Sequence, residues 1–205
     1  CPYAEQALYN IERNLGVRFA FIEYHCYDDL EVNGNINLLS YYGLETLPVT
    51  AIQGNESVFD GANIETYQSE IEQIIMPLLD QETKVKFYNL IADRIGNELD
   101  CSVEIEMVDE TLSLENLRLR YAVIEDHDTR HFNFIGETLH NVAKISGYED
   151  ISEIEGQMIK QFTVSGVQDL PEDLSLVVWV QTFPESYNPA TGRVHNVVKK
   201  SINRR

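Results

Sequence analysis

Cys1-Pro2 at the start of the sequence is the pair of residues best suited to chemistry. Apolar residues recur at helical spacing from Ala4 to Leu15, so Cys1 would stand at the N-terminus of an amphipathic helix. The free N–H groups and the dipole of a helix N-terminus stabilise a thiolate and lower the pKa of the thiol. Because a thiolate is the attacking group in thiol–disulfide exchange, Cys1 is a candidate catalytic residue.

His25 and Cys26 form a second group of candidates, since they end the element that follows this helix. They are possible redox neighbours of Cys1. His25 could carry protons, and Cys26 could form a disulfide with Cys1 if their Cα atoms lie within about 7 Å. Ordinary polarity of a surface loop is the alternative interpretation.

Pro48 is the other catalytic candidate, because it enters a predicted hairpin. A cis Leu47–Pro48 bond would turn the backbone of Leu47 toward the sulfur site. An extended peptide could pair there as an added strand, so a protein or peptide is the expected partner. The alternative is an ordinary trans-proline at a strand edge.

Glu125, Asp126 and Asp128 are the candidate metal ligands, within a run that ends at His131. Several oxygens close together are typical of a divalent-ion site. Their spacing matches neither an EF-hand loop nor the helical histidine pair of zinc enzymes. A charged turn between strands is therefore the simpler interpretation, and no cofactor is expected.

The composition limits the classes of partner. The sequence of 205 residues carries 34 acidic and 15 basic residues, for a net charge of −19. That charge repels nucleic acid and anionic membranes, so no nucleic-acid partner is expected. No run approaches the roughly 18 apolar residues of a membrane span, so we expect a chain that is not membrane-spanning. A mature lipoprotein also begins with cysteine, so acylation of Cys1 is an alternative to a free thiol.

The first 82 residues alternate between helical and extended patterns. Helices are predicted over 2–15, 35–42 and 64–79, a buried strand over 17–24, and hairpin strands over 47–52 and 57–59. This order resembles a thioredoxin fold that lacks its first strand. In that family the second cysteine of a Cys-x-x-Cys motif precedes a proline, and a cis-proline precedes the last hairpin.

The resemblance implies that Cys1 occupies the second, resolving position and that Pro48 is the cis-proline. It also implies an empty slot beside residues 17–24, because the first strand is central in the family's sheet. We expect this slot to be filled by residues upstream of Cys1 or, in a homo-oligomer, by a strand donated from a neighbouring chain.

Beyond residue 82 the pattern changes to alternating strands. They are predicted over 84–91, 102–108, 118–125, 137–145, 161–167, 175–181 and 194–202. Such a set is typical of a β-sandwich, with Trp179 in its core. The expected fold class is therefore an α/β thioredoxin-like domain over 1–82, with its first strand missing, followed by an all-β immunoglobulin-like sandwich over 83–205.

Short motifs in both halves resemble the Omp28-related proteins, which join a thioredoxin-like domain to a β-sandwich. They are Glu23-Tyr24-His25, the run from Tyr121 to Glu125, and the run from Leu139 to Val142. The resemblance implies an extracytoplasmic place in the cell envelope or outside the cell, with thiol–disulfide exchange as the ancestral chemistry. A cysteine three residues before Cys1 would favour the enzyme. The alternative is a non-catalytic structural or interaction subunit of the envelope or of an extracellular assembly.

Overall fold

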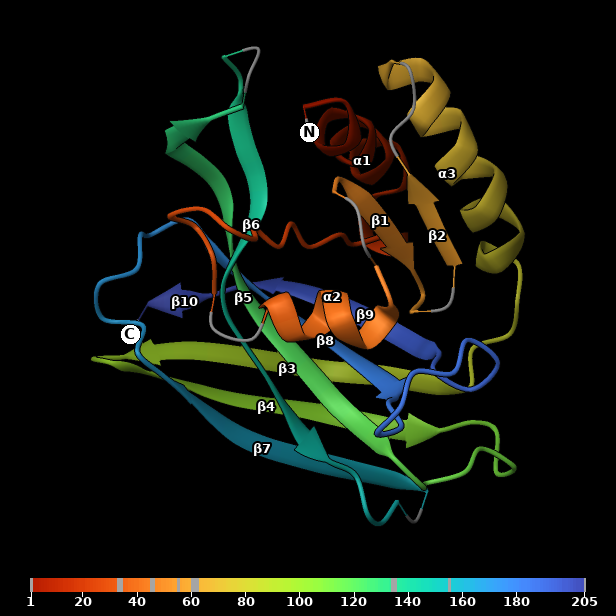
Figure 1. Cartoon of the computed structure of the whole chain (residues 1–205). Helices are drawn as coiled ribbons and strands as arrows, with labels where there is room; N and C mark the ends of the chain where they lie inside the picture. Colours follow the sequence, from red (N-terminus) through yellow and green to blue (C-terminus); the bar gives the residue numbers. More distant parts are fainter. Residues whose placement is uncertain are drawn as a thin grey trace.

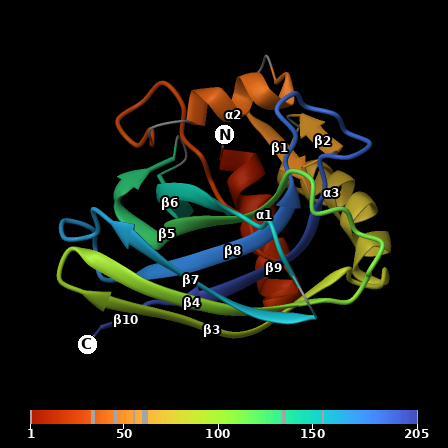
Figure 2. The same cartoon turned by 90° about the horizontal axis from the view of Figure 1, so that it is seen from below.

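A computed structural model describes residues 2–32, 35–44, 47–54, 56–59, 63–133, 136–154 and 156–204. The fold is mostly antiparallel sheet with few helices (Figure 1). Figures 1 and 2 place the sheet β6-β5-β8-β9 between the N-terminal elements and the sheet β10-β3-β4-β7. None of the described helices is long and apolar enough to cross a membrane.

The N-terminal elements follow the predicted order, with one exception. They are α1 (Pro2–Leu15), the 3-10 turn η1 (Gly16–Arg18), α2 (Asn35–Tyr42), β1 (Val49–Ile52), β2 (Glu56–Phe59) and α3 (Ile64–Leu79). Gly16 ends α1 with a φ of 57°, a left-handed conformation that glycine adopts without a steric penalty. Asn63 caps α3, since its side chain accepts a hydrogen bond from Thr66 N at 2.9 Å.

A small apolar core holds α1, α3 and the hairpin together. Its buried members are Ala4, Ala7, Ile11, Ile52, Val58, Tyr67, Ile71 and Ile75. The helical members recur three or four residues apart, so each helix turns one face to the hairpin. Tyr67 adds a polar anchor, because its hydroxyl donates to Val58 O at 3.2 Å and lies 2.7 Å from Thr50 Oγ1.

The predicted buried strand over 17–24 is wrong. Residues 16–18 form η1, and the extended chain after it is bridged only at Glu23, which pairs with Val142 of β6. The hairpin is thus a two-stranded sheet, not part of a larger sheet with residues 17–24. The physical reason is that Ala20 and Ile22 alternate onto the apolar outer face of β5 and β8, which replaces strand pairing as their source of burial.

The seven strands predicted beyond residue 82 all overlap observed ones. They are β3 (Val85–Ile95), β4 (Glu98–Met107), β5 (Leu117–Phe132), β6 (Thr138–Asp150), β7 (Gln157–Ser165), β8 (Leu174–Thr182) and β9 (Val194–Ser201), and a short β10 (Asn203–Arg204) follows. The two four-stranded sheets enclose an apolar core that runs from Val85 to Val180. The immunoglobulin-like topology stays a prediction.

The sheet β6-β5-β8-β9 is buried on both faces. One face lines the sandwich core, and the outer face carries a smaller cluster of Ala122, Ile124, Val177 and Trp179. The expectation that Trp179 belongs to the sandwich core is therefore wrong. Along β8 its neighbours Val178 and Val180 point into that core, so the strand alternation turns Trp179 toward the N-terminal elements.

Candidate functional site

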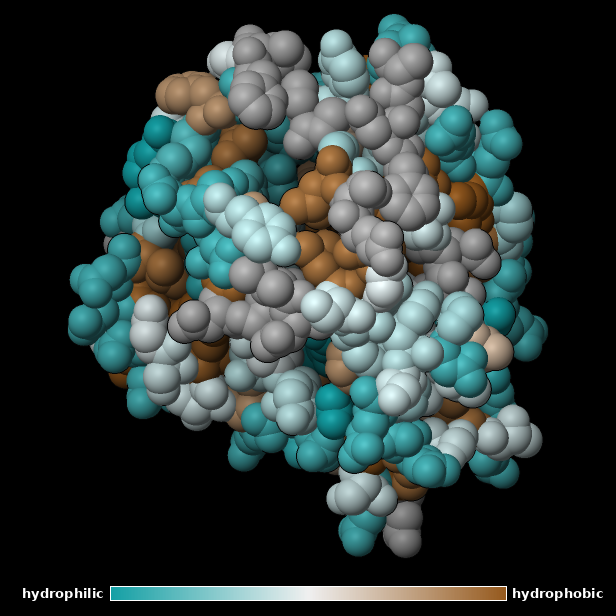
Figure 3. All heavy atoms as spheres, in the orientation of Figure 1, coloured by the Kyte–Doolittle hydropathy of each residue, from teal (hydrophilic) through white to brown (hydrophobic). Residues whose placement is uncertain are grey.

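A cavity of about 1440 Å³ lies between the N-terminal elements and the outer face of the sandwich. Its walls include residues 19–26, β1 and part of α2, and its floor includes side chains of β5 and β8. Small-molecule sites usually measure about 300–1000 Å³, so this cavity is large for such a ligand. Figure 3 shows apolar side chains in the middle of this face, between more hydrophilic surroundings.

Two backbone segments border the cavity without a full set of strand partners. One edge of β1 pairs with β2, and no other described strand pairs with its second edge. Across the cavity, Glu23 alone of residues 19–24 is bridged to a strand; its N–H donates to Asn141 O at 2.9 Å. The slot beside residues 17–24, which the resemblance to a thioredoxin fold implies, stays a prediction, because those residues do not form a strand.

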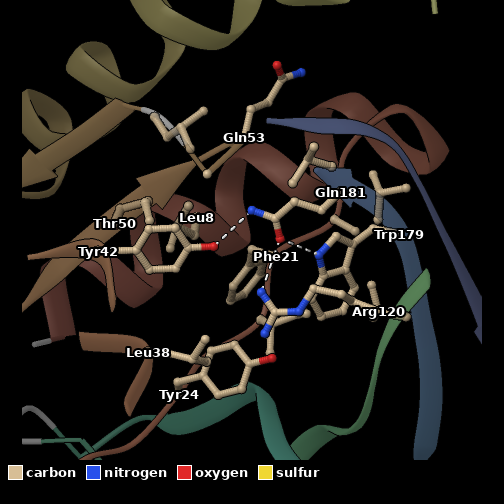
Figure 4. A pocket seen from close by; sticks show the side chains of 18 of the residues that line it. Leu8, Phe21, Tyr24, Leu38, Tyr42, Thr50, Gln53, Arg120, Trp179 and Gln181 are labelled. Carbon is tan, nitrogen blue, oxygen red and sulfur yellow. Dashed lines mark hydrogen bonds between the residues drawn. The ribbon is translucent and has the colours of Figure 1, made fainter. Parts of the chain in front are cut away.

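A polar cluster forms the floor of the cavity (Figure 4). Gln181 is fully buried, and its amide oxygen accepts from Arg120 Nη1 at 3.1 Å and from Trp179 Nε1 at 3.2 Å. Its amide nitrogen donates to Tyr42 Oη at 3.0 Å. Figure 4 shows Tyr24 lying beside Arg120, with its hydroxyl directed toward the guanidinium group.

The sequence did not single out Arg120 or Gln181. Arg120 comes from the alternating run of β5 and Gln181 from the end of the apolar run of β8. Polar residues inside such runs are a usable signal, because a buried strand rarely carries an uncompensated polar side chain. Only the packing of the N-terminal elements on β5 and β8 shows that both residues face a cavity.

Three predicted redox residues, His25, Cys26 and Pro48, line this same cavity. Cys1 lies outside the described residues, and so does its predicted contact with Pro48. The Leu47–Pro48 peptide bond is cis, as expected. The structure therefore places these three residues on the lining of one cavity.

The Cys26 thiol lacks the electrostatic environment of a reactive cysteine. Burial raises its pKa, and the negative charges of Glu31 and Asp28 raise it further. Burial alone would lower the pKa of His25, but its hydrogen bonds to Glu23 and Asp28 outweigh that effect and raise it. Cys26 and Cys101 are both free thiols, and burial raises the pKa of Cys101 to about 12.

The three predicted metal candidates are engaged with basic side chains. Lys144 Nζ lies 2.9 Å from both Glu125 Oε2 and Asp128 Oδ2. Asp126 Oδ1 lies 2.8 Å from Lys199 Nζ. Among the described residues no group of three or more His, Cys, Asp or Glu side chains is placed to hold a metal ion.

Comparison with known proteins finds a similar fold but no similar sequence. No protein-family model matches the sequence, and no curated protein does. HBP35 of Porphyromonas gingivalis matches with a TM-score of 0.63 and 13% identity over 82% of this chain. The chain shares its fold with HBP35. It spans 56% of the HBP35 chain that it matches, and at this identity the likeness concerns the fold alone.

Two weaker matches accompany HBP35. A domain of the outer membrane lipoprotein Omp28 from the same bacterium matches 61% of this chain and 93% of that domain, with 17% identity and a TM-score of 0.32. A beta-glucosidase from Kluyveromyces marxianus matches 71% of this chain and 18% of its own, with 8% identity and a TM-score of 0.26. The fold shared with HBP35 fits the predicted resemblance to Omp28-related proteins.

Proposed function

We propose that this protein is a non-catalytic interaction module whose cavity accepts an extended peptide as an added strand. One observation carries the proposal: β1 and residues 19–24, both short of strand partners, border the same cavity of about 1440 Å³. Unpaired backbone groups favour a partner that supplies N–H and C=O groups at regular spacing. An extended peptide does so, while apolar walls bind its alternate side chains.

The peptide that fills the cavity could come from the same polypeptide or from another molecule. A segment of the same polypeptide would bind within the molecule, whereas a donated strand would join molecules, as in the strand-exchanging homo-oligomer expected from the sequence. We commit to a peptide from another molecule. Binding within one molecule is then an outcome that the experiment below detects.

We further propose that residues 1–82 and 83–205 are two domains and that the first is thioredoxin-like. Separate apolar cores support the division, since one contains residues up to Leu78 and the other begins at Val85. The order of helices and hairpin supports the thioredoxin-like assignment. An extracytoplasmic location is supported by the short motifs that resemble those of Omp28-related proteins.

The test of strand binding is hydrogen exchange with a short blocked peptide of alternating valine and threonine. The amides of residues 19–24 and 49–52 should exchange more slowly when the peptide is bound, because they gain hydrogen-bond partners. Protection confined to other segments, or no binding, would refute the proposal. Unusually slow exchange at both segments in the free protein at high dilution would instead show that the groove is filled from within the molecule.

Leu38→Glu tests the contribution of the cavity to peptide binding. Leu38 lines the cavity, and a charge at this position would be buried against an apolar side chain of the peptide, which is unfavourable. We expect at least a tenfold loss of affinity. Met76→Glu is the matched control, since Met76 is 51% exposed on α3 and does not line the cavity. Equal affinity of both variants would contradict the assignment of the groove.

Thiol–disulfide exchange is a second candidate, favoured because His25, Cys26 and Pro48 share one cavity. Among the cysteines of the given sequence, Cys1 and Cys26 are the pair that could carry it. Non-reducing peptide mapping tests it directly. A Cys1–Cys26 disulfide that closes and opens reversibly would support exchange, whereas two thiols that stay free under mild oxidants would exclude exchange by this pair.

A further inference from the structure

Arg120 carries a buried positive charge that no described acidic side chain neutralises. Its side chain is 9% exposed, and it lines the floor of the cavity. Among the described residues, Arg120 donates a hydrogen bond to Gln181, and its guanidinium lies over the rings of Trp179 and Phe183, at 5.2 and 4.4 Å from their centroids. A buried charge is normally paired, because removal from water is unfavourable without a counter-charge.

A shortage of acidic residues does not explain this isolation. The chain has a net charge of −19. Arg118 lies two residues earlier on the same face of β5, and its Nε lies 3.3 Å from Asp150 Oδ1. Arg118, at the exposed end of this face, therefore has a carboxylate partner, whereas Arg120, inside the cavity, has none among the described residues.

The surroundings of Arg120 contain more hydrogen-bond donors than acceptors. Gln181 Oε1 already accepts from both Arg120 and Trp179. The hydroxyls of Tyr24 and Tyr41 are buried, and neither lies within hydrogen-bond distance and angle of a described acceptor; the side chain of Ser146 is the polar group that acts on the Tyr24 hydroxyl. Burial raises the pKa of each phenol to about 12, so both stay protonated and can donate.

A carboxylate matches this set of groups. It supplies a full negative charge and several lone pairs, which suit the planar fork of a guanidinium and one or two hydroxyl donors. We propose that Arg120 binds the carboxylate of an Asp or Glu side chain carried by the peptide that fills the groove. This inference rests on the proposed function and specifies the chemistry of the partner.

The experiment compares blocked peptides that differ in one side chain. A peptide of alternating valine and threonine, with lysine at both ends, carries a single glutamate at each interior position in turn, and glutamine at the same position is the control. Calorimetry measures both affinities. At one register the glutamate peptide should bind about 30-fold or more tightly than its glutamine counterpart, as expected for a desolvated charge pair.

Three variants assign the preference to the cavity floor. Arg120→Gln removes the charge, and Gln181→Glu places a carboxylate beside Arg120 inside the protein. Both should reduce the glutamate preference to less than about threefold. Arg118→Gln, the matched control, should leave the preference unchanged because Arg118 is paired with Asp150. A thermal melt of each variant verifies folding. The comparison of glutamate and glutamine peptides on the wild-type protein does not depend on any variant folding.

Each outcome is decisive. If glutamate and glutamine peptides bind the wild type equally well at every register, the carboxylate assignment is refuted while strand binding stands. The assignment also fails if the preference persists in a folded Arg120→Gln variant. If no peptide binds, the proposed function fails and this inference fails with it.

Discussion

Gln181 joins the side chains that form the floor of the cavity. Its amide uses both polar atoms, the oxygen toward Arg120 and Trp179 and the nitrogen toward Tyr42. Gly54 makes room for it, since a Cβ at Gly54 would stand 2.5 Å from Gln181 Nε2, and the φ of Gly54 is 77°. The contact between Gly54 and Gln181 therefore connects the turn of the N-terminal hairpin with β8.

We predict that Gln181→Leu lowers the free energy of unfolding by about 2–4 kcal/mol, because Arg120 and Trp179 lose their buried acceptor. Urea denaturation measures the change. Gln73→Leu on the exposed side of α3 is the control and should change the free energy by less than about 0.5 kcal/mol. Equal losses from both substitutions would show that the floor network contributes nothing specific.

Cys26 illustrates how neighbouring charge sets reactivity. Its pKa is raised by burial and by Glu31 and Asp28, so little thiolate is present at neutral pH. We predict that Glu31→Gln accelerates alkylation of Cys26 by iodoacetamide about two- to fivefold at pH 7.5, because one negative charge is removed. Cys101 in the sandwich core should react only on unfolding. An unchanged Cys26 rate would mean that the charge of Glu31 does not control this thiol.

At the scale of elements, α1 is attached to β6 through buried polar contacts. Glu5 is 5% exposed; its Oε1 lies 2.8 Å from His140 Nδ1, and its Oε2 accepts from Asn133 Nδ2 at 3.1 Å. Tyr9 stacks on the His140 ring with a centroid distance of 3.9 Å. These contacts hold one wall of the cavity against the sandwich.

Glu5→Ala should therefore destabilise the protein by about 1–3 kcal/mol and loosen α1, since it removes the carboxylate that binds His140 and accepts from Asn133. Glu5→Gln keeps one acceptor oxygen and should lose less than half as much. Hydrogen exchange of the α1 amides reports the loosening separately from global unfolding. If both substitutions behave alike, the carboxylate does not hold α1 in place.

At the scale of the whole molecule, two apolar cores meet across a smaller cluster. Ala20 and Ile22 contact that cluster on the outer face of β5 and β8. Near the predicted domain boundary, Thr83 Oγ1 donates to His195 O at 3.2 Å. His195 Nε2 lies 2.8 Å from Thr182 Oγ1, so the histidine connects the boundary with the end of β8.

Global stability should fall as the pH drops from about 6.5 to about 4. Burial and the charges of Lys84 and Arg193 lower the pKa of His195 from 6.5 to about 4. In this window the unfolded chain binds a proton that the folded chain does not, which favours unfolding. We predict that His195 accounts for about 1–3 kcal/mol of this loss, after allowance for its partial exposure.

The measurement is the difference in free energy of unfolding between wild type and His195→Gln across this pH range. The difference removes the contributions of other groups that titrate in acid, such as Asp128, whose pKa is lowered, and His25, whose pKa is raised. A difference that does not vary with pH would contradict the shifted pKa of His195.

Helix and strand positions could be read from the sequence because they depend on neighbouring residues. Periodicity and glycine placed α1, α2, α3 and the seven main strands close to where they lie. The same reasoning failed at residues 17–24, whose apolar pattern suits a strand equally well with or without a partner. Burial decides such a segment, and burial comes from distant residues.

The site divides in the same way. The sequence by itself determined the acidic charge, the positions of the helices and of the main strands, and the place of Pro48 at the entry of the hairpin, all local properties of the chain. Only the tertiary structure decided that His25, Cys26 and Pro48 line one cavity and that Arg120 stands in it without an acidic partner among the described residues. Isolation of a charge depends on every group packed around it, and those groups come from segments far apart in sequence.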